Sequence, residues 1–146
     1  MAQAAPTTGG MPRRGPTPDV FSPHTHLMAR RAFPIVTGLI YGYWAAANRR
    51  SGGPITGWNL LFGFVTAIVF ALVLFGVLTI GPRLRREVHA LMWTAFMGIA
   101  FGFLYSQSGE SVLRSTGMSL AVAAVTFIVM FYRFYTHEDA VGHRIR

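Results

Sequence analysis

Long apolar segments alternate along the chain with short stretches that carry most of its charge. Four such segments are found near 32–48, 56–80, 88–107 and 116–135, and the second contains no charged residue. About 20 mostly apolar residues form a helix that crosses about 30 Å of hydrocarbon. The pattern therefore predicts an all-α integral membrane protein with four transmembrane helices.

The predicted helices are joined by short connections at 49–55, 81–87 and 108–115. Short connections make consecutive helices antiparallel neighbours. Pro34 falls in the first turn of the first predicted helix, where a missing N–H costs little. The four spans therefore form two consecutive hairpins.

The two predicted hairpins are similar in sequence at a constant offset of 60 positions. Residues 35–69 and 95–129 share 10 identities in 35 aligned positions without a gap. Such a repeat indicates one structural unit used twice. We therefore expect a parallel tandem duplication, with repeat one at 32–80 and repeat two at 88–136. Because each repeat holds two spans, both insert the same way up, unlike the inverted repeats of many transporters.

Two glycine pairs occupy equivalent positions in the repeats, Gly38 and Gly42 in the first and Gly98 and Gly102 in the second. Glycines four residues apart share one helix face and let another backbone approach closely. We expect spans one and three to pack through these faces, against each other or against a second subunit. A gating hinge or a ligand groove at the same glycines is the alternative.

A thin polar strip is predicted along spans two and four, where Asn59 and Thr66 match Ser119 and Thr126. A threonine inside a membrane helix commonly bonds to the carbonyl four residues back. The alternative is that the four side chains line a polar path near the axis between the repeats.

Threonine and glycine also stand at the expected starts of spans two and four, as Thr56-Gly57 and Thr116-Gly117. A threonine oxygen at such a position accepts a hydrogen bond from a free N–H group of the first turn, so both threonines are predicted N-caps. An anion site at the same helix N-termini is the alternative.

The composition agrees with a membrane protein, since 52% of the 146 residues are hydrophobic and only 12% are charged. All 13 basic residues are arginines, which is typical of a GC-rich bacterial genome, and the absence of cysteine excludes disulfides and thiol chemistry. The formal charge of +8 lies at the ends of apolar segments, a pattern that favours membrane topology over nucleic-acid binding.

The arginines are distributed unequally between the two sides of the predicted bundle. Eight fall on one side and three on the other: Arg30, Arg31, Arg83, Arg85, Arg86, Arg133, Arg144 and Arg146 against Arg49, Arg50 and Arg114. The positive-inside rule then predicts a bacterial cytoplasmic membrane protein with both termini in the cytoplasm. Residues 1–31 are expected to form a disordered N-terminal tail, and 137–146 a cytoplasmic C-terminal tail.

Charged and titratable residues lie outside the predicted membrane core. His89, at the inner end of span three beside Arg86 and Glu87, could titrate near neutral pH, but a structural or solvated histidine is the simpler interpretation. In the outer connections Glu110 can pair with Arg114, and Arg50, which occupies the matching repeat position, could tie the hairpins together by pairing with Glu110.

Histidines near the tails, His24, His26, His137 and His143, match no defined metal-ligand spacing, so neither a metal nor a cofactor is predicted. No nucleophile elbow, phosphate-binding loop or zinc-protease motif is present. We therefore expect a non-enzymatic accessory or scaffolding subunit that acts through helix–helix packing, with the lipid bilayer and either its own copies or another membrane protein as partners. An oligomeric pore or transporter for a small solute or ion is the alternative, and an enzyme acting on lipids at the membrane face is a third hypothesis.

Overall fold

The structure is a computed structural model that describes residues 23–137. It contains four α-helices and one 3-10 turn: α1 (Pro23–Arg50), α2 (Gly57–Ile80), η1 (Gly81–Arg83), α3 (Arg86–Ser106) and α4 (Val112–His137). No residue between 23 and 137 belongs to a β-strand. The prediction of an all-helical chain is therefore confirmed for this part of the protein.

Three of the four helices are long and apolar enough to cross a membrane: Gly57–Arg83, Arg86–Ser106 and Val112–His137. The first helix, α1, does not reach the same hydropathy, because arginine pairs flank a short uncharged stretch of it, 32–48. Of the four predicted transmembrane helices, α2, α3 and α4 thus have the length and hydropathy of a membrane span.

The first helix is also longer than expected, because it begins at Pro23. Residues 23–31, expected to be part of the disordered tail, form its first turns. Pro34 consequently lies inside α1 and not in its first turn. Residues 1–22 and 138–146, which hold the rest of the two expected tails, lie outside the described part of the chain.

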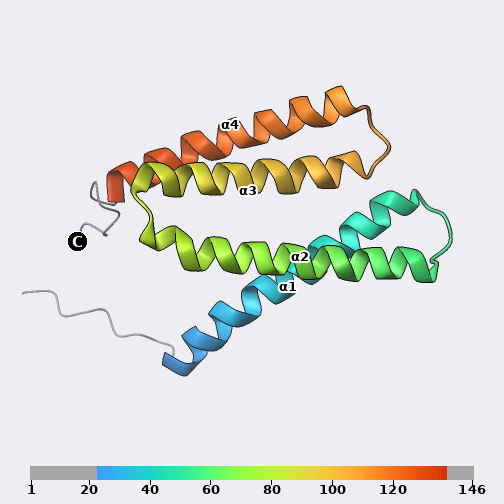
Figure 1. Ribbon diagram of the computed structural model, residues 1–146, viewed down its shortest axis with the longest axis horizontal. Helices are drawn as coiled ribbons and strands as arrows, with labels where there is room; N and C mark the ends of the chain where they lie inside the picture. The colour runs from blue at the N-terminus through green and yellow to red at the C-terminus, as the bar shows by residue number, and fades with distance from the viewer. Residues whose placement is uncertain (1–22, 138–146) are drawn as a thin grey trace, which may run out of the picture.

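Figure 1 shows two helical hairpins, α1 with α2 and α3 with α4, joined by η1. The α1–α2 and α3–α4 connections lie at one end of the molecule, which we call the hairpin-loop end. The start of α1, the η1 link and the last turn of α4 lie at the other end. Helices α2 and α3 run side by side in the middle, and α1 crosses α2 obliquely.

Small residues form the core of the first hairpin. A Cβ atom added at Gly38 would lie 2.7 Å from the carbonyl oxygen of Ala67 and 2.9 Å from the Ala71 Cβ. At Gly42 it would overlap the carbonyl oxygen of Gly63 and lie 2.7 Å from the Ala67 Cβ. The backbones of α1 and α2 can approach this closely only because no side chain stands between them.

The second hairpin is packed in the same way. A Cβ atom at Gly98 would lie 2.9 Å from the Ala123 Cβ, and one at Gly102 would lie 2.7 Å from the Ser119 hydroxyl oxygen. Each glycine pair therefore faces the second helix of its own hairpin. This corrects the expectation that spans one and three pack through these glycines against each other or against a second subunit.

The connection between helices is shifted by about one helical turn in the second hairpin. At the offset of 60 positions, the end of α1 at Arg50 corresponds to position 110, but α3 ends at Ser106. Likewise α4 begins at Val112, five residues before the position that matches Gly57. The glycine contacts are shifted in the same way. Gly42 faces Gly63, whereas its match Gly102 faces Ser119, which lies four residues before Ala123, the match of Gly63.

Helix capping shows the same shift. The Thr56 hydroxyl oxygen accepts a hydrogen bond from the Asn59 backbone N–H at 3.2 Å, so the predicted N-cap of α2 is confirmed. Thr116 is not an N-cap, because it lies inside α4. The Ser111 hydroxyl oxygen instead accepts from the Arg114 N–H at 3.3 Å. A serine within the expected loop caps the helix first and lengthens it by about one turn.

The close contact in the first hairpin predicts unequal effects of two alanine substitutions in apolar helices. Gly42→Ala is expected to lower the free energy of unfolding by about 1–3 kcal/mol, because its methyl group overlaps the α2 backbone. Gly76→Ala is the matched control, since a Cβ there would meet nothing within 4 Å. Thermal unfolding in detergent micelles, followed by circular dichroism, measures both. Equal stability of the two variants would contradict the proposed packing.

Candidate functional site

Three cavities mark the places where the helices do not pack closely. The first, of about 230 Å³, lies along the seam of α1 and α2 near the hairpin-loop end. The second, of about 410 Å³, lies between the hairpins and is lined by α1, α2 and α3. The third, of about 280 Å³, lies at the opposite end, around η1 and His89. These cavities are the candidate sites, and the predicted polar residues can be placed relative to them.

Two of the four predicted polar residues form hydrogen bonds between the two helices of their own hairpin. The Asn59 side-chain amide of α2 donates to the carbonyl oxygen of Ala46 in α1 at 2.9 Å. The Ser119 hydroxyl of α4 donates to the carbonyl oxygen of Gly98 in α3 at 2.6 Å. Equivalent positions in the two repeats thus connect equivalent pairs of helices, although Asn59 and Ser119 themselves lie in different hairpins.

The two threonines have different surroundings. The Thr126 hydroxyl donates to the carbonyl oxygen of Val122 in its own helix at 2.8 Å. Thr66 is buried, with 9% of its surface exposed, and borders the cavity between the hairpins. Neither Ser119 nor Thr126 lines one of the three cavities, and Asn59 lines a different one from Thr66. The structure does not gather the four residues around one path.

The hairpins are connected by side chains of α1 that reach the backbone of α3. The Tyr41 hydroxyl donates to the carbonyl oxygen of Ala100 at 2.6 Å, and the Asn48 amide donates to that of Leu104 at 3.3 Å. The Tyr41 ring also stacks on Phe70 at 4.1 Å between ring centroids. Sequence reasoning missed both polar residues, although a tyrosine and an asparagine inside an apolar segment are a signal that a partner exists.

Apolar side chains dominate the cavity between the hairpins, and no charged residue lines it. Its aromatic rings come from three helices: Tyr41 of α1, Phe62 and Phe70 of α2, and Phe96 and Phe103 of α3. The rings contact one another across the hairpin boundary, with centroids 5.3 Å apart for Phe70 and Phe96. Such a lining accommodates hydrocarbon, and its phenol, that of Tyr41, is already engaged with the Ala100 carbonyl oxygen.

His89 forms part of the packing at the η1 end. Only 7% of its surface is exposed, its ring stacks on Phe134 with centroids 4.0 Å apart, and its Nε2 accepts from the Trp93 indole N–H at 3.2 Å. A Cβ atom at Gly81 would lie 2.7 Å from this same nitrogen. The histidine therefore holds η1, α3 and α4 together, in keeping with its structural interpretation.

The charged neighbours of His89 in sequence are engaged elsewhere. The Arg86 Nε lies 3.3 Å from a Glu87 carboxylate oxygen, and the Arg86 guanidinium lies over the Tyr135 ring at 4.3 Å from its centroid. The contact of Arg86 with Tyr135 joins α3 to α4 at the arginine-rich end, and the Arg86–Glu87 pair lies within α3.

Arginines at the hairpin-loop end have unequal surroundings. Arg114 pairs with Glu110 at 2.9 Å, as predicted, and Arg49 lies over the Phe62 ring at 4.4 Å from its centroid. The expected pair of Arg50 with Glu110 is not formed. Arg50 instead lines the cavity between α1 and α2, where its Nε is buried and has no hydrogen-bond acceptor among residues 23–137.

Among the side chains that the structure describes, no three histidine or acidic residues are grouped as a metal would need. Most of the histidine and carboxylate candidates of the tails lie outside residues 23–137 or have undescribed side chains. Comparison of the chain with protein-family models, with curated proteins and with solved structures finds no match. The interpretation of these cavities therefore depends on their own geometry.

The hydrogen bond from Ser119 to the other helix of its hairpin predicts that two hydroxyl residues of α4 contribute unequally to stability. Ser119→Ala is expected to lower the free energy of unfolding by about 0.6–1.7 kcal/mol, because it removes a bond between two membrane helices. Thr126→Val should cost less, because its hydroxyl bonds only within its own helix. Reversible unfolding in mixed micelles measures the two variants side by side. A larger loss for Thr126→Val would contradict the role given to Ser119.

Proposed function

We propose that this chain is a small integral protein of a bacterial cytoplasmic membrane and a non-enzymatic accessory or scaffolding subunit that binds another membrane protein through helix–helix packing. The membrane placement is supported by three apolar helices of spanning length and by large apolar side chains exposed along all four helices.

The observation that carries this proposal is the open face of α4. Among the described elements α4 packs against α3 alone. Gly117, Ala121 and Ala124 lie on one side of α4 at helical spacing, and all three are exposed. A Cβ atom at Gly117 would meet nothing within 4 Å. Small residues at this spacing are what a second membrane helix needs for close approach.

The glycines expected to bind a partner are therefore not the ones available to it. Gly38, Gly42, Gly98 and Gly102 are occupied inside the hairpins, whereas Gly117 is free of contacts with other helices. The proposed partner helix lies along Gly117 and Ala121. Apolar neighbours on α4, among them Leu120 and Ile128, which are 65% and 66% exposed, widen this surface.

An oligomeric pore has less support. Its expected lining was Asn59, Thr66, Ser119 and Thr126, and three of these four use their polar atoms in hydrogen bonds to helix carbonyls. A bundle in which polar groups bond internally offers few ligands to water or to an ion. The accessory subunit is for this reason the preferred proposal.

We further propose that both termini lie in the cytoplasm and that the two hairpins arose by tandem duplication. The start of α1, η1 and the end of α4 share one end of the molecule (Figure 1), and these segments, with the start of α3 that follows η1, hold the arginines of the larger group that the structure describes: Arg30, Arg31, Arg83, Arg85, Arg86 and Arg133. Asn59 and Ser119 occupy matching positions, and each donates a hydrogen bond from the second helix of its hairpin to a carbonyl oxygen of the first helix. This shared role supports duplication. The one-turn shift of the connection is then a later divergence.

The open face of α4 predicts the loss of a partner after a single substitution. Gly117→Leu is expected to reduce the amount of the co-purified partner about tenfold, because overpacking of a helix contact costs about 1–3 kcal/mol. Gly76→Leu is the matched control, since a Cβ atom at Gly76 would likewise meet nothing within 4 Å. Native mass spectrometry of the tagged protein from its own host measures both.

Two results would contradict an accessory subunit that binds its partner through α4. One is a homo-oligomer with no other chain that conducts ions or solutes in liposomes, which would support the pore. The other is a partner that remains bound to Gly117→Leu while Gly76→Leu loses it, which would place the interface on α2.

The arginine asymmetry predicts the outcome of a reporter fusion at the C-terminus. A fluorescent protein that folds only in the cytoplasm should be bright, and alkaline phosphatase, which needs the periplasm, should be inactive. The converse pair of results would reverse the proposed orientation.

A further inference from the structure

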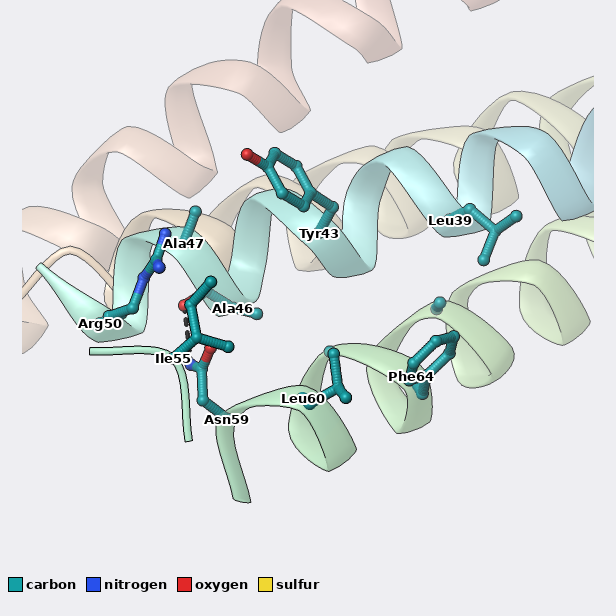
Figure 2. A pocket seen from close by; sticks show the side chains of 11 residues that line it. Leu39, Tyr43, Ala46, Ala47, Arg50, Ile55, Asn59, Leu60 and Phe64 are labelled. Carbon is teal, nitrogen blue, oxygen red and sulfur yellow. Dashed lines mark hydrogen bonds between the residues drawn. The ribbon is translucent and has the colours of Figure 1, made fainter. Parts of the chain in front are cut away.

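We propose that the groove between α1 and α2 is a binding site for one anionic phospholipid, with the headgroup phosphate at Arg50 and one acyl chain along the groove. This inference depends on the proposed membrane placement but not on the proposed protein partner. Figure 2 shows the groove, whose walls are the facing sides of α1 and α2. Ile55, from the connection between the helices, lies at its Arg50 end.

The buried nitrogen of Arg50 is the first argument. A buried donor without an acceptor costs free energy, and more so when the group is charged. The Nε of Arg50 is such a donor among residues 23–137, and Arg50 lines the groove. In Figure 2 the Arg50 side chain turns back along α1 toward Ala47, and the Tyr43 hydroxyl points to the same end of the groove. A phosphate oxygen is the acceptor that a planar guanidinium binds best.

The local charge favours an anionic ligand. The nearest acidic residue of the hairpin-loop end, Glu110, is paired with Arg114 at 2.9 Å. Between residues 23 and 137 the only other acidic residue is Glu87, which lies at the opposite end of the molecule. Arg49 and Arg50 are thus not neutralised locally, and a lipid with a net negative headgroup complements them better than a zwitterionic one.

The lining of the groove fits an acyl chain. Away from Arg50 it is apolar, with Leu39 of α1 and Leu60 and Phe64 of α2 along its walls. Arg50 is eleven positions after Leu39, which corresponds to roughly 16 Å along a helix. One leaflet of a bilayer contributes about 15 Å of hydrocarbon. The groove therefore extends from a basic rim through about the depth of one leaflet, as a phospholipid chain does.

The neighbouring arginine provides a matched control. Arg49 carries the same charge at the same end of α1, but its guanidinium lies over the Phe62 ring and it does not line the groove. Arg49→Gln and Arg50→Gln therefore change the net charge equally, but only Arg50→Gln removes a guanidinium that lines the groove. A third variant, Leu60→Trp, places a larger ring on the wall of the groove and leaves both arginines unchanged.

The experiment is a titration of the full-length protein in detergent with palmitoyl-oleoyl phosphatidylglycerol, followed by native mass spectrometry. The first lipid adduct of the wild type and of Arg49→Gln should form with the same affinity. Arg50→Gln should bind it about tenfold more weakly, equal to about 1.4 kcal/mol. Leu60→Trp should also weaken it, and phosphatidylcholine with the same chains should bind the wild type more weakly than phosphatidylglycerol.

Three outcomes would overturn the lipid site. Equal losses in Arg49→Gln and Arg50→Gln would mean that only diffuse charge attracts the lipid. Equal binding of phosphatidylcholine would remove the role of the anionic headgroup. Glycerol 1-phosphate competing as well as the lipid would show that the chain does not occupy the groove. A protein absent from the membrane fraction would instead contradict the proposed membrane placement, so the two failures are distinguishable.

Discussion

Close approach of two backbones inside each hairpin is the constraint on which the rest of the structure depends. In a membrane, hydrophobic burial does not hold helices together, so they associate through packing and interhelical hydrogen bonds. Gly42 against Gly63, and Gly98 against Ala123, bring the paired helices near enough for Asn59 and Ser119 side chains to reach opposite carbonyl groups. The register of each hairpin, and with it the shape of the groove beside Arg50, follows from these contacts.

The joint between the hairpins is built differently. It consists of aromatic side chains around a cavity and of two hydrogen bonds from Tyr41 and Asn48 to carbonyls of α3. Larger rings cannot interdigitate as closely as glycine and alanine, which explains why the cavity between the hairpins, about 410 Å³, is larger than the groove of about 230 Å³ within the first hairpin. The molecule is thus two closely packed hairpins with an adaptable boundary, and α4 lies on its outer side with one face open.

Polar groups in this protein mainly serve structure. In the predicted polar strip, Asn59 and Ser119 each bond to the other helix of their own hairpin, Thr126 bonds within its own helix, and Thr66 borders the cavity between the hairpins. His89 is part of a packed aromatic cluster. Arg50 and Ser115 are exceptions, because the Arg50 Nε and the Ser115 hydroxyl are buried and have no hydrogen-bond partner among the described residues. The proposed functions accordingly use surfaces: the small-residue face of α4 for a protein helix and the α1–α2 groove for a lipid.

The sequence by itself determined the helical class, the hairpin connectivity, three apolar helices of spanning length and the N-cap at Thr56, because these depend on local hydropathy, short connections and capping chemistry. Only the tertiary structure decided that the glycine pairs face their own hairpins, that Ser111 and not Thr116 caps α4, and that Arg50 faces a groove instead of Glu110. The physical reason is that these helices are apolar on nearly every side. Their sequence therefore has no polar face to distinguish a surface that meets lipid from one that meets another helix.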